Sequence, residues 1–308
     1  MCYRKKEGVL MEKLFNIEDS LRQRLADIKT QHTGKIYHYT SAVGLKGIVD
    51  SGKIWFSDIG FLNDSSEATY IYKIIKPLLN KDNLSSDFKN LVYKLCSDFS
   101  KTDFCVYKNT PIWKNKCYVA SFSTEKDCLS LWNYYTKNDN GVGYNIETDV
   151  YETFEHNPEI ILINGKVIYN IEDQEKLLVN VLNNYNNYYN QNINNDINNF
   201  DEKIVISLSG ILEFYNLFFK PKEYEVENEY RFVIFDKDCE IIRDCKYRIN
   251  NGCYIPYYEM PLQNDAISLI YVSPAKEQEM LIHGVELLIG HTRFASANVK
   301  GSEIPKRY

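Results

Sequence analysis

The sequence lacks a long apolar run, and it lacks paired cysteines. No apolar stretch in the 308 residues is long enough to span a bilayer, so we expect no membrane association. The eight cysteines form no C-x-x-C pair and have no histidine at zinc-ligand spacing, and no signal peptide precedes them. We therefore expect reduced thiols in the core of a cytoplasmic protein, and no metal.

The common cofactor and hydrolase signatures are also absent. The segment "GVG" at 141–143 lacks the third glycine of a dinucleotide fingerprint and the helix that should follow it. The chain contains no G-x-x-x-x-G-K-[ST], no G-x-S-x-G and no H-E-x-x-H. Any nucleotide chemistry must therefore use another fold.

The net charge is small, at −6, and the chain has no long basic run. A general attraction to a phosphate backbone therefore contributes little. Nucleic acid is not excluded as a partner, but it would need a local basic patch that the sequence does not show.

What the sequence does contain is a mixture of strand and helix patterns. Strands are predicted at 35–40 and 53–57, on either side of a short helix that Thr40 or Ser41 can cap and Gly52 can end. Further strand patterns occur at 116–123, 140–147, 229–235, 253–260, 267–274 and in the tail at 296–308, and helical patterns at 64–80, 85–102, 125–136 and 275–282.

The strands and helices do not alternate regularly, which favours an α+β fold over a doubly wound sheet. Apolar residues at helical spacing predict a helix over 9–30, in an N-terminal extension over 1–34. Helical spacing throughout 171–219 predicts a helical hairpin inserted into a single domain over 35–308.

The stretch "VENEYRFVIF" at 226–235 begins with charges and ends as an apolar segment. Alternate residues of a strand share a face, so Glu227, Glu229 and Arg231 would line one face just before a segment covered on both sides. Two close carboxylates beside an arginine suit a functional site. A surface ladder of charges with little effect on stability is the alternative.

Six motifs occur in a characteristic order. They are "YHYT" at 37–40, Asn63-Asp64-x-x-Glu67, Phe122-Ser123, Trp132-x-x-Tyr135, Glu227-x-Glu229-x-Arg231 and Ser302-x-Ile304-Pro305-x-Arg307. In this order and spacing they resemble a large, mostly bacterial family, domain of unknown function 2971, from about residue 35 to the C-terminus. Tyr224 stands where the family more often has tryptophan.

The layout also resembles that of the ADP-ribosyltransferases, which implies mixed or antiparallel sheets of the ADP-ribosyltransferase-like type and NAD as substrate. By this resemblance Glu229 would stabilise the positive charge that develops on the ribose, and Glu227 would orient or deprotonate the acceptor. His38 would hydrogen-bond the other ribose. NAD contacts are implied for Tyr39, Thr40, Ser123, Trp132, Tyr135 and Arg231, with an aromatic ring on the nicotinamide and the arginine on Glu229 or a phosphate.

The sequence hypothesis is thus an NAD-consuming ADP-ribosyltransferase or NAD glycohydrolase, of the kind that serves as a toxin or phage-defence effector. Its acceptor would be a protein or a nucleic acid, and a regulatory protein partner is compatible with it. One alternative is a non-catalytic module that senses a nucleotide or a partner. A second is a hydrolase or nuclease with a divalent cation on Asp64, Glu67, Glu227 and Glu229.

Each candidate also has a structural explanation. His38 could be a structural histidine, Asp64 and Glu67 a capping box, and Ser123 an N-cap. Trp132 and Tyr135, one turn apart, could pack in the core. If Glu229 acts in catalysis, Glu229→Gln should lower turnover by roughly 10²-fold or more and change melting little.

Overall fold

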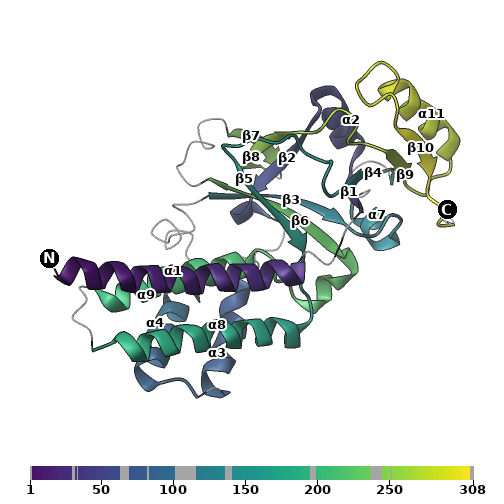
Figure 1. The fold of residues 1–308 in the computed structure, drawn as a ribbon. Helices are drawn as coiled ribbons and strands as arrows, with labels where there is room; N and C mark the ends of the chain where they lie inside the picture. The colour runs from purple at the N-terminus through teal and green to yellow at the C-terminus, as the bar shows by residue number, and fades with distance from the viewer. Residues whose placement is uncertain are drawn as a thin grey trace.

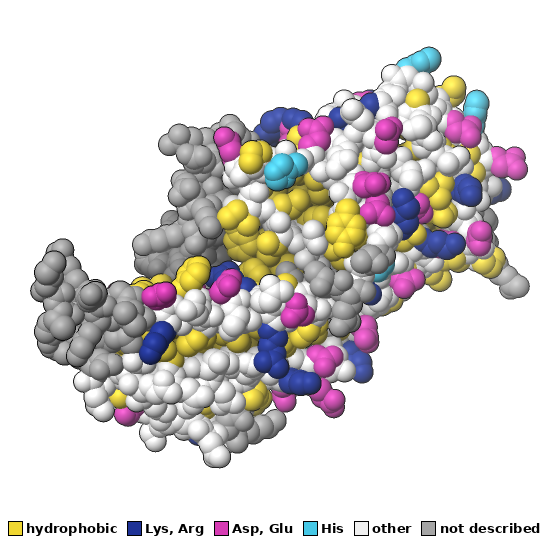
Figure 2. Space-filling model, viewed as in Figure 1, with side chains coloured by type: hydrophobic (Ala, Val, Ile, Leu, Met, Phe, Trp, Pro, Cys, Tyr) yellow, Lys and Arg dark blue, Asp and Glu magenta, His cyan; other side chains and the backbone are white. Residues whose placement is uncertain are grey.

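The computed structural model describes residues 2–29, 32, 34–62, 69–81, 83–100, 116–135, 141–194, 199–236, 245–250 and 252–305. Over these residues the fold is α+β, with a large open sheet and a layer of helices against one part of it (Figure 1). Charged side chains of both signs are mixed over the face shown in Figure 2, without a field of one sign.

The sheet is mostly antiparallel. Its strands are β1 (Lys35–Thr40), β2 (Lys53–Asp58), β3 (Lys116–Ser123), β4 (Tyr144–Asp149), β5 (Ile161–Lys166), β6 (Glu229–Asp236), β7 (Lys246–Asn250), β8 (Cys253–Pro261), β9 (Leu269–Val272) and β10 (Asn298–Gly301). Their order is β10-β9-β4-β1-β3-β2-β8-β7, while β6 pairs with both β3 and β5. Strands β9 and β10 run parallel, and the other pairs are antiparallel.

Strand β3 lies at the point where the sheet divides. It pairs with β6 along its whole length, but with β1 only at Tyr37↔Ser123 and with β2 only near the strand's other end. Strands β1 and β2 both lie on the side of β3 opposite β6, and they separate from each other along β3. This division positions the site described below.

The helices fall into two groups. A layer below the sheet in Figure 1 contains α1 (Cys2–Lys29), α3 (Tyr70–Lys81), α4 (Ser86–Ser100), α8 (Ile171–Asn192) and α9 (Phe200–Asn216). The others are α2 (Ala42–Ser51), α7 (Leu129–Tyr135), α11 (Gln278–Ile289) and the short 3₁₀ helices η1 (Ile59–Phe61) and η3 (Lys222–Glu227).

The predicted helical hairpin and N-terminal helix are confirmed. Helices α8 and α9 occupy the predicted segment, and Asn170 caps α8 by accepting hydrogen bonds from the backbone of Glu172 and Asp173. The N-terminal helix α1 packs against this pair, since Leu21 is buried there and its carbonyl accepts a hydrogen bond from the Tyr215 hydroxyl at 2.9 Å. Helix α1 is thus part of the helical layer.

The prediction that the segment after Glu229 is covered on both sides is confirmed as well. Phe232 and Ile234 pack into the core on one face of β6, whereas Val233 packs against the helical layer on the other. The short helix after β1 also ends as predicted, with Ser41 as N-cap and Gly52 in the left-handed region at φ 66°.

Other local predictions need correction. Strands β5 and β7 were not expected, and the helix expected from 125 begins only at Leu129. Cys128 and Cys245 are partly exposed and Cys253 is exposed, so not all cysteines are core thiols. Among the described residues, no helix is both long and apolar enough to cross a membrane.

Candidate functional site

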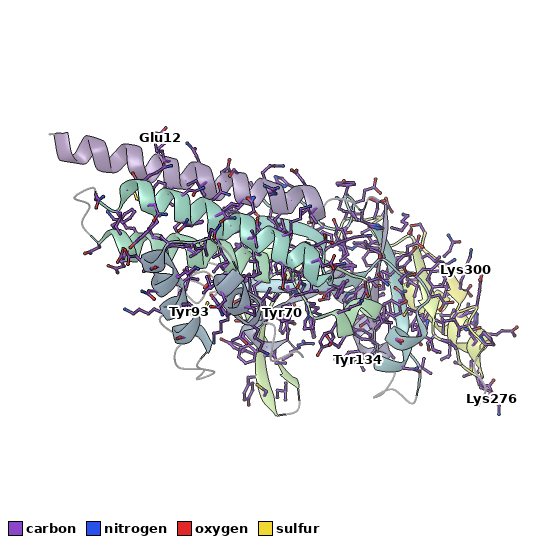
Figure 3. The ribbon with its side chains drawn as sticks, turned by 90° about the horizontal axis from the view of Figure 1, so that it is seen from below. Glu12, Tyr70, Tyr93, Tyr134, Lys276 and Lys300 are labelled. Carbon is purple, nitrogen blue, oxygen red and sulfur yellow. The ribbon has the colours of Figure 1, made fainter. Side chains whose placement is uncertain are left out.

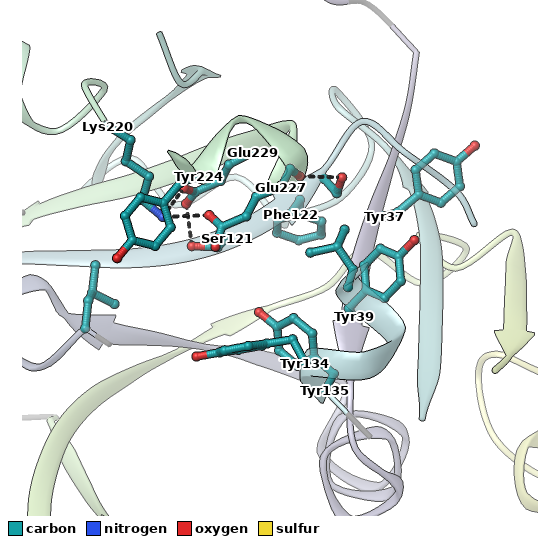
Figure 4. Close-up of a pocket in the computed structure, with 13 residues that line it drawn as sticks. Tyr37, Tyr39, Ser121, Phe122, Tyr134, Tyr135, Lys220, Tyr224, Glu227 and Glu229 are labelled. Atoms are coloured by element: carbon teal, nitrogen blue, oxygen red, sulfur yellow. Dashed lines mark hydrogen bonds and ion pairs between the residues drawn. The ribbon is translucent and has the colours of Figure 1, made fainter. Parts of the chain in front are cut away.

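A pocket of about 250 Å³ lies where β1, β3 and β6 meet the end of the helical layer. One side is polar, with Ser121, Ser123, Lys220, Glu227 and Glu229. The facing sides carry the four tyrosines Tyr37, Tyr39, Tyr134 and Tyr135, whereas a fifth, Tyr224, lies beside Lys220 (Figure 4).

The pocket lies between the two ends of the molecule. Seen from below, Tyr134 stands between the helical layer, which carries Tyr70 and Tyr93, and the opposite end, which carries Lys276 and Lys300 (Figure 3). The lining comes mainly from the sheet, from α7 and from the segment that follows α9, where Lys220 lies.

Glu229, the first residue of β6, is the centre of the polar side and is only 3% exposed. Its Oε1 accepts hydrogen bonds from the Ser121 hydroxyl at 2.6 Å and from Arg231 Nε at 2.8 Å. Its Oε2 accepts from Arg231 Nη2 at 2.9 Å and contacts Lys220 Nζ at 2.8 Å. Both carboxylate oxygens thus receive two donors each.

These contacts decide the charge of Glu229. Burial by itself would raise the pKa of the carboxyl, but the charges of Arg231 and Lys220 outweigh burial and hold that pKa well below its ordinary value. Glu229 is therefore an ionised carboxylate at neutral pH. It is also held in one orientation by neighbours on three different segments.

Glu227 reaches the same site from a different backbone conformation than expected. It ends η3, and Asn228 in the left-handed region at φ 41° separates it from β6. The prediction that Glu227 lies on the strand is therefore wrong. Its Oε2 nevertheless contacts Lys220 Nζ at 2.9 Å, so Lys220 bridges Glu227 and Glu229.

Arg231 fixes the orientation of the Glu229 carboxylate. The side chain is 1% exposed, and its Nη1 donates to the Leu217 carbonyl at 2.7 Å while Nε and Nη2 hold Glu229. Of the two roles that the resemblance implied, fixing Glu229 agrees with this geometry. Contact with a ligand phosphate does not, because the guanidinium is enclosed and does not line the pocket.

The tyrosine side is formed by β1 and α7. Tyr39 stacks near Tyr135 with ring centroids 6.1 Å apart, and its hydroxyl donates to the Glu125 carbonyl at 2.9 Å. Burial, followed by the nearby charges of Glu229 and Glu227, raises the pKa of Tyr135. Burial and the Glu147 carboxylate raise the pKa of Tyr37 to about 12. All of these phenols are therefore neutral at physiological pH.

His38 does not line this pocket, so the pocket brings together Glu227 and Glu229 without the third candidate catalytic residue. Tyr37 pairs with Ser123, which pairs with Glu229, so these three side chains share a face. His38, between Tyr37 and Tyr39, points to the other face, where its ring meets Phe122 at 5.1 Å.

The histidine has a structural partner instead. His38 Nδ1 donates to the Ser121 carbonyl at 3.0 Å, at the place where β1 leaves β3. The proton must be on Nδ1, because a carbonyl only accepts. Burial lowers the pKa of this imidazole, and the hydrogen bond opposes that shift only in part.

Three further candidates occupy structural positions. Thr40 is buried on the same face as His38 and does not line the pocket. Ser123 lines it, but its hydroxyl donates to the Glu227 carbonyl at 2.7 Å and accepts from the Glu125 amide at 3.0 Å, so it shapes a turn and does not cap a helix. Trp132 is 2% exposed and packs edge-on against Tyr39 at 4.8 Å.

Trp132 also belongs to a second polar cluster, which is centred on Asp127. Its Nε1 donates to Asp127 Oδ1 at 2.6 Å. The same carboxylate accepts from the Ser302 hydroxyl at 2.7 Å and the Glu303 amide at 3.0 Å, which attaches the C-terminal motif to the turn before α7. Arg307 lies outside the described residues.

The sequence analysis did not single out Lys220, Ser121 or Tyr134, and it gave Tyr37 no role beyond its place in the "YHYT" motif. Ser121 and Tyr37 had a usable signal, because each stands two residues from a candidate on the same predicted strand, Ser123 and Tyr39. Lys220 had none, since its position depends on how the helical hairpin returns to the sheet.

The donor set offers little to a metal ion. Glu227 and Glu229 already share Lys220, and Glu229 also holds Arg231. Among the residues that the structure describes, no three His, Cys, Asp or Glu side chains gather to form a metal site. Asp64 and Glu67, the other proposed ligands and the proposed capping box, lie outside the described residues.

Residues 131–232 match the family described as protein of unknown function (DUF2971). The match supports the expected similarity to that family over α7, the helical hairpin and the Glu227–Arg231 motif, but does not extend to His38 or Ser302. No curated protein and no solved structure matches the chain.

Proposed function

We propose that the protein consumes NAD, as an ADP-ribosyltransferase or NAD glycohydrolase, with the pocket at Glu229 as its active site. The observation that supports this most strongly is the carboxylate of Glu229. It is held ionised, nearly excluded from solvent and in one orientation at the wall of a pocket.

Such a carboxylate is suited to a developing positive charge. Breaking the bond between nicotinamide and ribose leaves cationic character on the ribose, and a fixed carboxylate stabilises that charge best where water is excluded. Arg231 and Lys220 keep Glu229 ionised, although they also neutralise part of its field. The ribose must therefore approach close to an oxygen of Glu229.

Ser121 provides a route for that approach. Its hydroxyl lines the pocket and donates to Glu229 Oε1 at 2.6 Å. A ribose hydroxyl can take this position if the serine hydroxyl rotates, because one neutral O–H donor then replaces another. The two cationic donors of Glu229 stay in place.

The remaining walls fit the rest of the ligand. The volume of about 250 Å³ is smaller than the roughly 300–1,000 Å³ of ordinary ligand sites, so the pocket suits nicotinamide and its ribose, with the remainder of NAD outside. Tyr135 or Tyr134 would contact the nicotinamide ring. Glu227, whose side chain is 32% exposed, would orient the acceptor, a water, a protein or a nucleic acid. An effector role as a toxin or in phage defence would follow from NAD depletion or target modification.

The test is release of nicotinamide from NAD by the full chain. We expect Glu229→Gln to lower the rate by about 10²-fold or more, because it removes the charge. Glu259→Gln is the matched control, since Glu259 also contacts two lysines but lies on the far strand β8, outside the pocket. Equal rates for wild type and Glu229→Gln would overturn the assignment. A melting curve of each variant shows whether loss of activity is loss of folding.

One observation favours a second candidate, a nucleotide-sensing module without catalysis. All four acceptor positions of Glu229 are occupied, as in a structural ion cluster. If wild type binds NAD with measurable affinity and releases no nicotinamide with any acceptor, this module is the better account.

A further inference from the structure

Arg248 on β7 is a cation to which the described part of the chain offers no anion. Its Nη2 donates to the Ser57 hydroxyl at 3.0 Å, and its Nε is enclosed by protein with no hydrogen-bond acceptor among the described residues. No carboxylate lies within ion-pair distance of it among the described residues. Other cations on this sheet differ: Lys246, two residues earlier, contacts Glu259 at 2.9 Å, and Arg231 holds Glu229.

The absence of a counter-charge has an energetic consequence. Arg248 is partly buried, and burial lowers the pKa of its guanidinium. An arginine nevertheless stays charged at physiological pH, so this cation has lost part of its hydration without gaining a carboxylate. An anion from outside would restore the balance.

The strand register places Arg248 on the face of the sheet that carries the pocket. Lys246 pairs with Tyr257, and Tyr257 pairs with Ser57, which in turn pairs with Val119, two residues before Ser121 on β3. Side chains two apart share a face, so Arg248, Ser57 and Ser121 all project to one side. Tyr135, which lines the pocket, lies close enough to Arg248 to raise the pKa of its guanidinium.

From this placement we infer that Arg248 binds a phosphate group of a ligand whose other end occupies the pocket at Glu229. The guanidinium carries five N–H donors, and one of them is used, by Ser57, which also orients the group. Its planar fork can meet two phosphate oxygens at once. The identity of the ligand as NAD rests on the proposed function, whereas the recognition of an oxyanion does not.

The test is isothermal titration of the full chain with three probes, ADP-ribose, inorganic pyrophosphate and nicotinamide. We expect Arg248→Gln to weaken ADP-ribose and pyrophosphate by about ten- to a hundred-fold, since a charged hydrogen bond is lost, and to leave nicotinamide binding unchanged. Arg248→Lys keeps the charge but loses the planar fork, so its affinities for ADP-ribose and pyrophosphate should lie between those of wild type and Arg248→Gln. Lys246→Gln removes the same charge from the same strand and should bind all three probes as wild type does.

The outcomes separate this inference from the proposed function. ADP-ribose and pyrophosphate affinities that Arg248→Gln leaves within twofold of wild type overturn the anion site, as does a wild type that binds neither probe. If both phosphate probes depend on Arg248 but NAD is never cleaved, the anion site stands and the enzymatic proposal fails. If Arg248→Gln does not fold, Arg248→Lys is compared with Lys246→Gln instead. Only Arg248→Lys should then bind ADP-ribose and pyrophosphate more weakly than wild type.

Discussion

Replacing Glu229 by glutamine tests the buried ion cluster directly, through stability. Glutamine has the same shape but carries an NH₂ group where the carboxylate has an oxygen. In one orientation of the amide this group faces Arg231 Nε, and in the other it faces Arg231 Nη2 and Lys220, all of which are donors. Either way a donor meets a donor, and two buried cations lose a full counter-charge.

The magnitude follows from burial. Arg231 is 1% exposed and the Lys220 side chain 9%, so solvent cannot replace the lost charge. Removing one partner of a buried ion pair costs about 3–5 kcal/mol. With a fall of about 2–4 °C per kcal/mol in domains of 150–250 residues, Tm should drop by at least about 5 °C in this longer chain. The sequence-based expectation of little change in melting assumed a less buried residue.

The dependence on pH provides a second readout. The pKa of Glu229 is lowered on folding, so its contribution is fully present above its ordinary value near 4.5 and is lost as the pH falls towards the lowered value. The difference in unfolding free energy between wild type and Glu229→Gln should therefore be largest near pH 7 and shrink below about pH 4.5. Chemical denaturation at several pH values measures it.

The control for stability is again Glu259→Gln. Glu259 contacts Lys53 and Lys246, whose side chains are 39% and 58% exposed, so solvent can replace the lost charge and the change should cost about 0–1 kcal/mol. A Glu229→Gln variant that unfolds within 1 kcal/mol of wild type would show that the cluster does not form as described.

Three further predictions concern other contacts of the site. Asp127→Asn places an amide against donors, so it should cost about 1–3 kcal/mol and speed hydrogen exchange at the Glu303 amide; unchanged exchange would contradict the attachment of the C-terminal motif. His38→Phe should cost about 1 kcal/mol of stability through the lost hydrogen bond to a carbonyl, and it should leave nicotinamide release unchanged. Because burial lowers the pKa of folded His38, only the unfolded histidine gains a proton just below about pH 6.5, so we expect the stability of wild type to fall there by more than that of His38→Phe. Glu227→Gln leaves Lys220 in contact with Glu229, so it should lower nicotinamide release by about tenfold or more with a Tm within a few degrees of wild type, and equal release would remove Glu227 from the mechanism.

The sequence predicts the helical elements well where apolar spacing is long and regular. The hairpin and the N-terminal helix followed from this spacing, and the double burial of β6 followed from an unbroken apolar run. Strand β5 was not predicted, because "NG" at 164–165 is typical of a turn. In the structure Asn164 stays in the strand, and its Oδ1 accepts a hydrogen bond from the Tyr230 hydroxyl at 2.7 Å.

The site was predictable only in part, because it combines strand geometry with tertiary contacts. Assigning both His38 and Tyr39 to one pocket conflicts with the alternation of side chains along a strand, and that conflict was visible in the sequence. Choosing between them needed the pairing of Tyr37 with Ser123, which local patterns do not supply. Glu227 lines the same pocket as Glu229 although it does not lie on the strand, and Lys220 contacts both carboxylates.

The helical hairpin is more than an insertion beside the sheet, because its two ends build the site. The Leu217 carbonyl, just after α9, accepts from Arg231, and Lys220 three residues later bridges the two carboxylates. Gln174 near the start of α8 is fully buried, and its Nε2 donates to the carbonyls of Ile168 and Lys220 at 2.6 and 2.9 Å. The entry and exit of the hairpin are thus tied to each other at Lys220, one of the two cations that keep Glu229 ionised. Anything that shifts the hairpin would therefore move a cation that contacts both carboxylates of the pocket.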